Sequence, residues 1–258
     1  MNKTKIPWAD VAWNPFAGCS PVSQSCLYCY AAKLHNKRHR AWLDGKAVPA
    51  QYRLPFSTVQ TFADRLDQPL RAREPQAVFV GSMGDLFNLR IPPWFRRAVF
   101  STMVNAPQHT FLALSQRAAW LSAQTVSSKN IWLGVTVEDQ WTADKRIPML
   151  LEAPAAHRFV SVEPMLGPTN LQTYLMEIKD SFADCVRREG GIETVICGCG
   201  FGPNRRQMNP DWARSLRDQC AEADVPFFLK QMEIGGRVVK MPTLDGVVHD
   251  DLGWELHK

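Results

Sequence analysis

The chain has 258 residues, of which 45% are hydrophobic and 21% are charged, and its formal net charge is +5 at pH 7. The length predicts one large domain or two small ones, and the composition is that of an ordinary soluble protein. No apolar run approaches the roughly 20 residues that cross a bilayer, and the N-terminus lacks the apolar core of a secretory signal. These features exclude a membrane-spanning protein, so we expect a cytoplasmic protein with no membrane partner.

The first segment with a chemical signature is GCSPVSQSCLYCYAAKL, residues 18–34, which holds three of the seven cysteines. Cys26 and Cys29 form a C-x2-C pair, and Cys19 precedes them in a C-x6-C spacing. Cytoplasmic thiols stay reduced, so clustered cysteines indicate metal ligands rather than disulfides. Thiolates at such spacings hold zinc or an iron–sulfur cluster.

The number of ligands separates these two alternatives. A structural zinc site normally has four protein ligands. The nearest candidates for a fourth ligand are His35, His39, Cys197 and Cys199. Three thiolates on a 4Fe–4S cluster instead leave one iron open to a small molecule, which suits an enzyme. A zinc knuckle and three unrelated buried cysteines are the alternative interpretations.

The stretch from about residue 35 to residue 76 is basic, contains proline and lacks periodicity, so we interpret it as a partly helical insertion. Beyond it, six short apolar runs predict strands that are covered on both faces. These runs are residues 77–82, 110–115, 131–138, 157–164, 194–200 and 225–231. Helical patterns lie between them at residues 92–106, 142–153 and 209–224. The last of these has an Asn cap followed by Pro at the first helical position.

Alternating strands and helices predict a parallel sheet with right-handed crossovers. We therefore expect an α/β fold, a partial or full (β/α) barrel of about six to seven parallel strands over residues 1–231. A doubly wound open sheet is the alternative, because periodicity does not separate the two. Residues 232–258, which include GGRVVKMPTLDG, are expected to form a C-terminal hairpin or cap.

Polar residues follow the apolar part of nearly every predicted strand. Among them are Ser82, Asp85, Glu138, Ser161 and Glu163. In α/β folds the carboxyl ends of parallel strands form the active-site face, so these residues predict a polar site at one mouth of the sheet.

Basic residues gather just after the cysteines, in KLHNKRHRAW at residues 33–42, and continue with Arg65, Arg71 and Arg73. Such residues can hold phosphates. One hypothesis is therefore a non-catalytic nucleic-acid-binding module stabilised by zinc or by a cluster. In an enzyme, the same residues would guide a nucleic-acid or nucleotide substrate to the site.

The segment CLYCY resembles the end of the radical S-adenosylmethionine (SAM) cysteine motif, although the usual spacing there is C-x3-C-x2-C. Longer segments, among them WNPFAGCSPVSQSCLYCYA, AVFVGSMGDLF and MNPDWARSLRDQCAEADVPFFLKQ, together resemble a radical-SAM-like family of unknown function. That family is frequent in phages and prophages. It is distantly similar to spore photoproduct lyase, a DNA-repair radical enzyme.

This resemblance implies roles for residues that the motifs match. Cys19, Cys26 and Cys29 would bind a 4Fe–4S cluster, and Tyr28 would lie beside the adenine of SAM. The strand-end residues Ser82, Asp85, Glu138, Ser161 and Glu163 would contact the cofactor or the substrate. An external donor would reduce the cluster, which would cleave SAM to a 5′-deoxyadenosyl radical that acts on the substrate.

The predicted strand at residues 194–200 departs from the family pattern. Relatives carry a segment like VIVGGESGP, whereas this chain has VICGCGFGP at residues 195–203. In an ideal strand the side chains of Cys197 and Cys199 point to the same face. If that face is the interior of the barrel, either thiol could donate a hydrogen atom to a substrate radical. We therefore name both as candidate catalytic residues, with buried packing as the alternative.

Overall fold

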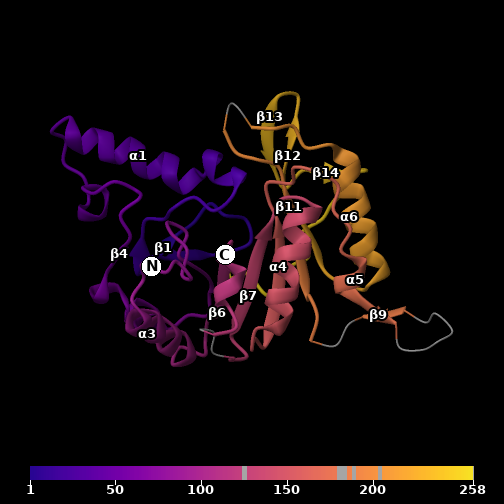
Figure 1. Ribbon diagram of the computed structural model, residues 1–258, viewed down its shortest axis with the longest axis horizontal. Coiled ribbons are helices and arrows are strands. Elements are labelled where there is room, and N and C mark those ends of the chain that lie inside the picture. The colour runs from indigo at the N-terminus through magenta and orange to yellow at the C-terminus, as the bar shows by residue number, and fades with distance from the viewer. Residues whose placement is uncertain (124–126, 179–184, 188–189, 203–204, 258) are drawn as a thin grey trace.

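The computed structural model describes residues 1–123, 127–178, 185–187, 190–202 and 205–257. Its centre is a nine-stranded sheet in the order β1-β2-β5-β6-β7-β8-β11-β12-β13 (Figure 1). These strands are β1 (Asn2–Lys3), β2 (Val11–Trp13), β5 (Ala77–Val80), β6 (Thr110–Ser115), β7 (Ile131–Val137), β8 (His157–Val162), β11 (Thr194–Gly198), β12 (Phe227–Ile234) and β13 (Arg237–Lys240).

Three two-stranded pairs and six α-helices complete the described elements. The pairs are β3 (Phe16–Ala17) with β4 (Gln60–Thr61), β9 (Met176–Ile178) with β10 (Cys185–Arg187), and β14 (Thr243–Leu244) with β15 (Val247–Val248). The helices are α1 (Tyr30–Leu43), α2 (Gln68–Arg71), α3 (Pro93–Val104), α4 (Gln140–Glu152), α5 (Gln172–Leu175) and α6 (Pro210–Glu222). Short 3-10 turns occur at η1 (Gln24–Tyr28), η2 (Ala50–Tyr52), η3 (Ala63–Arg65) and η4 (Ala118–Trp120).

The predicted α/β class, the six predicted strands and the three predicted helices are confirmed. From β2 to β12 the strands of the central sheet pair in parallel, and β1 and β13 add antiparallel edges. The strands follow one another in chain order, whereas a doubly wound sheet reverses its order at the centre. Within the described residues no pairing joins the two edges, so barrel closure is not seen.

The two faces of the sheet bury different sets of side chains because successive residues of a strand point to opposite faces. One face packs on helices, with α4 on β7 and β8 and α6 on β12. The opposite face forms an aromatic cluster that includes Phe79, Trp132 and Phe159. The C-terminal tail completes this cluster, because the ring of Trp254 lies 4.9 Å from Trp132 and 5.6 Å from Phe159. The aromatic cluster and the tail thus fill the inner face below the carboxyl ends of the strands.

Local signals explain where the covering helices begin. Asp139 and Thr142 form a reciprocal capping box at the start of α4. Asn209 caps α6 by accepting from the backbone of Asp211, and Pro210 occupies the first turn as predicted. None of the described helices is both long and apolar enough to cross a membrane.

Residues 35–76 and residues 232–258 were predicted to lie outside the sheet as an insertion and a C-terminal hairpin or cap. The expected insertion at about 35–76 contains most of α1, which begins earlier, at Tyr30, together with the short elements from η2 to α2. Within 232–258, the end of β12 turns through Gly235 and Gly236 into β13. The tail beyond β13 then runs back under the sheet, where the carbonyl of Leu252 accepts a hydrogen bond from Thr194 Oγ1.

Candidate functional site

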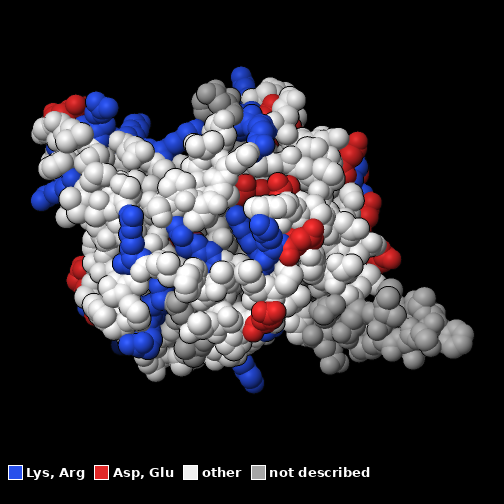
Figure 2. All heavy atoms as spheres, in the orientation of Figure 1, with Lys and Arg blue, Asp and Glu red and all other residues white. Residues whose placement is uncertain are grey.

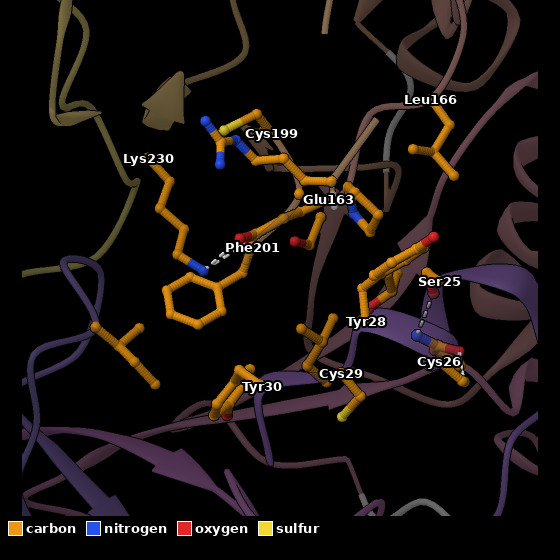
Figure 3. Close-up of a pocket in the computed structure, with 18 of the residues that line it drawn as sticks. Ser25, Cys26, Tyr28, Cys29, Tyr30, Glu163, Leu166, Cys199, Phe201 and Lys230 are labelled. Atoms are coloured by element: carbon orange, nitrogen blue, oxygen red, sulfur yellow. Dashed lines mark hydrogen bonds and ion pairs between the residues drawn. The ribbon is translucent and has the colours of Figure 1, made fainter. Parts of the chain in front are cut away.

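A hollow with a cavity volume of about 190 Å³ opens at the carboxyl ends of the strands (Figure 3). Its wall combines residues from both ends of the chain. They are Ile6, Trp8, Ser25, Cys26, Tyr28, Cys29, Tyr30, Phe79, Leu114, Gln116, Thr136, Ser161, Glu163, Pro164, Leu166, Cys199, Gly200, Phe201, Arg205, Arg206 and Lys230. Of the five strand-end residues named from the sequence, Ser161 and Glu163 belong to this wall.

The cysteine loop, residues 18–29, forms one wall of this hollow. It begins at Gly18, whose φ of 92° and close approach to the carbonyl of Thr58 leave no room for a side chain. Cys26 lies within the turn η1 and Cys29 directly follows it, both line the hollow, and Leu27 between them is 74% exposed. Cys19 lies at the start of the loop, where its sulfur is 3.8 Å from the side-chain amide of Asn88.

The first half of the loop is held by Arg117, which follows β6. Its guanidinium donates to the carbonyl and the hydroxyl of Ser20 at 2.8 and 3.0 Å, and lies 3.9 Å from the sulfur of Cys19. Asp85 lies 3.8 Å from the other side of this guanidinium. The Asp85 carboxylate also accepts hydrogen bonds from Ser115 Oγ and from the backbone of Gln116. Asp85, a predicted cofactor contact, thus bonds within the protein and supports Arg117.

The second half of the loop is held by Glu138 at the end of β7. The Glu138 carboxylate, 3% exposed, accepts from the hydroxyl of Ser25 at 2.8 Å and from its backbone N–H at 3.3 Å. Arg146 lies 3.6 Å from the same carboxylate. Gln116 joins this network, because its side chain donates to Ser25 and accepts from the Cys26 thiol. Glu138 is therefore bonded to the cysteine loop, and it does not line the main hollow.

The protein environment favours protonated thiols at Cys19 and Cys29. Burial raises the pKa of Cys19, and the nearby Asp85 carboxylate adds to this, while Arg117 opposes it. Burial also raises the pKa of Cys29. Metal ions bind thiolates, so metal uptake by these cysteines would release protons and strengthen as the pH rises.

The wall opposite the cysteine loop carries a charged pair. Lys230, at β12, donates to both oxygens of Glu163 at 2.6 and 2.7 Å, and both side chains line the hollow (Figure 3). Glu163 follows β8, whose Ser161 also lines the hollow. The pair is neutral overall, so it offers a ligand one anionic and one cationic partner in a largely apolar cavity.

Cys197 and Cys199, both in the predicted strand at residues 194–200, have different surroundings in the structure. A register irregularity follows Cys197 in β11. Cys197 packs in the core with its sulfur 3.7 Å from the sulfur of Met165, whereas Cys199 lines the hollow. Burial, followed by the nearby Glu163 carboxylate, raises the pKa of Cys199 to about 11, so its thiol is protonated at neutral pH. Burial raises the pKa of Cys197 even further.

The predicted site residues therefore form two groups. Tyr28, Ser161, Glu163 and Cys199 line the hollow together with Cys26 and Cys29. Asp85, Glu138 and Ser82 bond to nearby loops instead, and Ser82 exchanges hydrogen bonds with the side-chain amide of Asn14.

Sequence reasoning assigned no role to several residues of the wall. Lys230 was recognised as a polar residue at a strand end, and Gln116 directly follows a predicted strand, so their positions were a usable signal. Phe201 and Arg206 lie on the segment after β11, and no pattern in the sequence marks them. Phe201 is 52% exposed.

The possible metal ligands do not form one compact group. Among the described residues, no group of three or more His, Cys, Asp or Glu side chains is placed to hold a metal ion. The histidines named as a possible fourth zinc ligand have other partners, since His35 bonds to the carbonyl of Leu54 and His39 to that of Tyr52. Of the three loop cysteines, Cys26 and Cys29 line the hollow, whereas Cys19 does not.

Comparison with known proteins gives one match. Residues 3–252 match the model of a family described as "Protein of unknown function (DUF5131)". No curated protein and no solved structure matches the chain. The match covers nearly the whole chain, and its description names neither a reaction nor a ligand.

Proposed function

The chain belongs to the DUF5131 family, and we propose that it is an iron–sulfur enzyme of the radical SAM type. The observation that carries this proposal is the position of Cys26 and Cys29 on the wall of a hollow at the carboxyl ends of parallel strands. With Cys19 they would hold a 4Fe–4S cluster, and the hollow beside them would take SAM. Such a cluster, once reduced by an external donor, supplies the electron that cleaves SAM to a 5′-deoxyadenosyl radical.

The chain's own residues would position the cofactor and exclude water. Glu163 and Lys230 offer partners for an ammonium and a carboxylate, the two charged groups of an amino acid. Tyr28 supplies an aromatic face beside Cys29, and Ser161 supplies a hydroxyl. The aromatic cluster under the hollow closes its floor to water. We further propose that the parallel sheet is a partial barrel, and that the protein works in the cytoplasm, where its thiols stay reduced.

Cys199 is the thiol that we propose as a hydrogen-atom donor. It lines the hollow and is protonated at neutral pH, which that role requires. Cys197 is the weaker candidate, since it packs against Met165 in the core.

The proposed substrate is a nucleic acid or a nucleotide. Helix α1 carries four Lys and Arg residues and no carboxylate. Lys33, Lys37 and Arg40 are exposed, and their i, i+4, i+7 spacing places them along one side of the helix. Lys33 lies 6.0 Å from the ring of Tyr28 on the hollow wall, so this row of cations begins at the mouth. Figure 2 shows Lys and Arg side chains over α1 at the upper left.

Two of the other basic residues expected to bind phosphate have partners within the protein. Arg71 pairs with Asp67, and Arg65 packs on Phe62 and donates to the carbonyl of Asn14. Arg73 is exposed. Phosphate binding is therefore proposed for α1 and Arg73, and not for Arg65 or Arg71. A non-catalytic nucleic-acid-binding module would use the same helix, and it is the second candidate function.

A product assay separates the two candidates. Protein reconstituted with iron and sulfide under anaerobic conditions is incubated with SAM and dithionite, and the mixture is analysed by chromatography. The enzyme proposal predicts 5′-deoxyadenosine from the wild type and none from Cys26→Ala. An intact cluster that neither binds SAM by calorimetry nor yields this product would contradict the radical SAM proposal.

A further inference from the structure

The segment between the first two cysteines, residues 20–25, is fastened at both of its ends. Arg117 holds Ser20, next to Cys19, and Glu138 holds Ser25, next to Cys26. Both partners come from the ends of sheet strands and lie more than 90 residues away along the chain. A loop held in this way loses conformational freedom at its ends, where the cysteines are.

The middle of this segment has contacts of its own. Pro21 and Val22 are exposed, and the backbone N–H of Val22 donates to the sulfur of Cys26 at 3.4 Å. Ser23 Oγ donates to Gln116 Oε1 at 3.1 Å, and the side chain of Gln24 accepts from Arg206 at 3.2 Å. At the end that carries Cys26, the buried contacts are those of Ser25 with Glu138.

Glu138 does not line the main hollow, and its carboxylate bonds within the protein. Its Oε1 accepts from the Ser25 hydroxyl and lies near Arg146, and its Oε2 accepts from the Ser25 N–H. A buried carboxylate is costly unless it is paired and hydrogen-bonded, and Glu138 meets this requirement through Arg146 and the cysteine loop. Removing Ser25 or Glu138 would therefore release the segment that carries Cys26.

We propose that Glu138 is a positioning residue that acts through Ser25 to fix Cys26 at the mouth of the hollow. Gln116 completes this support, since it bonds to both Ser25 and the Cys26 thiol. The six-residue spacing between the first two cysteines is accommodated by this attachment. This inference depends on the proposed function only for the identity of the metal centre that the three thiols bind.

The test uses the metal-free, reduced protein, so it does not depend on a cluster. Wild type, Ser25→Ala, Glu138→Ala and Glu138→Gln are treated with iodoacetamide under anaerobic conditions, and the alkylation rate of each cysteine is followed by mass spectrometry. Cys19, which is held by Arg117, is the internal reference. Buried Cys220 in α6 reports whether the fold is intact. Glu193→Ala is the matched control, because it removes a carboxylate bonded to His157 at the opposite end of β8.

We expect Ser25→Ala and Glu138→Ala to raise the alkylation rate of Cys26 about tenfold, because each removes a hydrogen bond to a buried charged group. Cys19 and Cys220 should keep their wild-type rates, and Glu193→Ala should match the wild type at all three cysteines. Glu138→Gln keeps an oxygen that accepts from Ser25, so it should restore most of the protection. After reconstitution, Ser25→Ala should also alter the electron paramagnetic resonance signal of the reduced cluster.

An unchanged Cys26 rate in Ser25→Ala, with Cys220 still protected, would overturn the inference. An equal rise at Cys19 and Cys26 would also overturn it, because the whole loop would then respond. Ser25→Ala leaves the Glu138–Arg146 pair in place, so it decides the question if Glu138→Ala fails to fold. If the alkylation rates are as expected but the protein takes up no iron, the proposed function is contradicted and the positioning role of Glu138 is retained.

Discussion

Two sides of the hollow carry carboxylates at strand ends, and they use them in opposite ways. On the cysteine side, formed by the ends of β5, β6 and β7, Asp85 and Glu138 bond to loops and to arginines within the protein. On the lysine side, formed by the ends of β8, β11 and β12, Glu163 faces the hollow and pairs with Lys230. In this protein a carboxylate at the end of a parallel strand therefore either supports a loop or faces the hollow.

This comparison assigns different consequences to the two sides. Changes on the cysteine side should alter what the three thiols hold, and changes on the lysine side should alter what enters the hollow. Iron content and ligand affinity are separate measurements, so each side can be tested without the other.

The largest effect is expected for the thiols themselves. Cys19→Ala, Cys26→Ala and Cys29→Ala should each lower iron content at least about tenfold, because even outer-shell partners of a metal site are worth that much. Cys199→Ala, on the lysine side, and Cys220→Ala should retain the iron of the wild type. Iron is measured by a colorimetric assay after anaerobic reconstitution. Full iron in any one of the first three variants would remove that cysteine from the ligand set.

On the lysine side, Lys230→Met should lower the free energy of unfolding by about 2–3 kcal/mol, because it leaves Glu163 charged and without its partner. Their side chains are only 15% and 18% exposed, so solvent screens the pair weakly. Adding Glu163→Gln should recover part of this loss. Urea unfolding gives the stabilities, and calorimetry should show weaker SAM binding with unchanged iron content. Additive effects of the two substitutions would show that the ion pair is not coupled.

Helix α1, next to the cysteine side, is the surface that we propose to bind nucleic-acid phosphates. Neutralising Lys33, Lys37 and Arg40 together should weaken binding of single-stranded DNA or RNA. It should also lower the salt slope by about 2, because each phosphate contact on a single strand contributes about 0.7. The control variant replaces Lys3, Lys5 and Lys129, which are exposed and make the same change in net charge. Equal effects of the two triple variants in gel-shift titrations at two salt concentrations would indicate nonspecific attraction.

The smallest effect is a pH dependence on the lysine side. Burial raises the pKa of Cys199 to about 11, so folding holds its proton more tightly than the unfolded chain does. The stabilising contribution of this thiol is complete below the unfolded pKa near 9 and is lost as the pH rises to about 11. Stability curves of wild type and Cys199→Ala should therefore converge over this interval. Curves that stay parallel from pH 8 to pH 11 would contradict the raised pKa.

Much of the fold followed from the sequence, because buried strands such as residues 131–137 read as uninterrupted apolar runs. Helix α6 was equally predictable from its Asn209 cap and from Pro210 in its first turn. Strand β2 escaped prediction because it has only three residues. The start of α1 was missed because its first turn follows Cys29 without a capping side chain, and the cysteine motif obscured the helical pattern.

The site was less accessible for a physical reason. Its polar residues were recognisable at strand ends, but their partners are set by contacts between distant segments. Ser25 and Glu138 are 113 positions apart, and Glu163 and Lys230 are 67 apart. Whether a carboxylate faces a loop or a hollow depends on these pairings, and residue type alone does not specify them. The irregularity after Cys197 in β11 likewise separates two thiols that an ideal strand would place on one face.

The most direct test of the central claim is the metal content of protein purified without oxygen. The cysteine side is proposed to hold one 4Fe–4S cluster, so the wild type should be brown, with about four iron and four sulfide per chain. Its reduced form should give the electron paramagnetic resonance signal of such a cluster. Colourless protein that holds about one zinc per chain after the same purification and reconstitution would contradict the account.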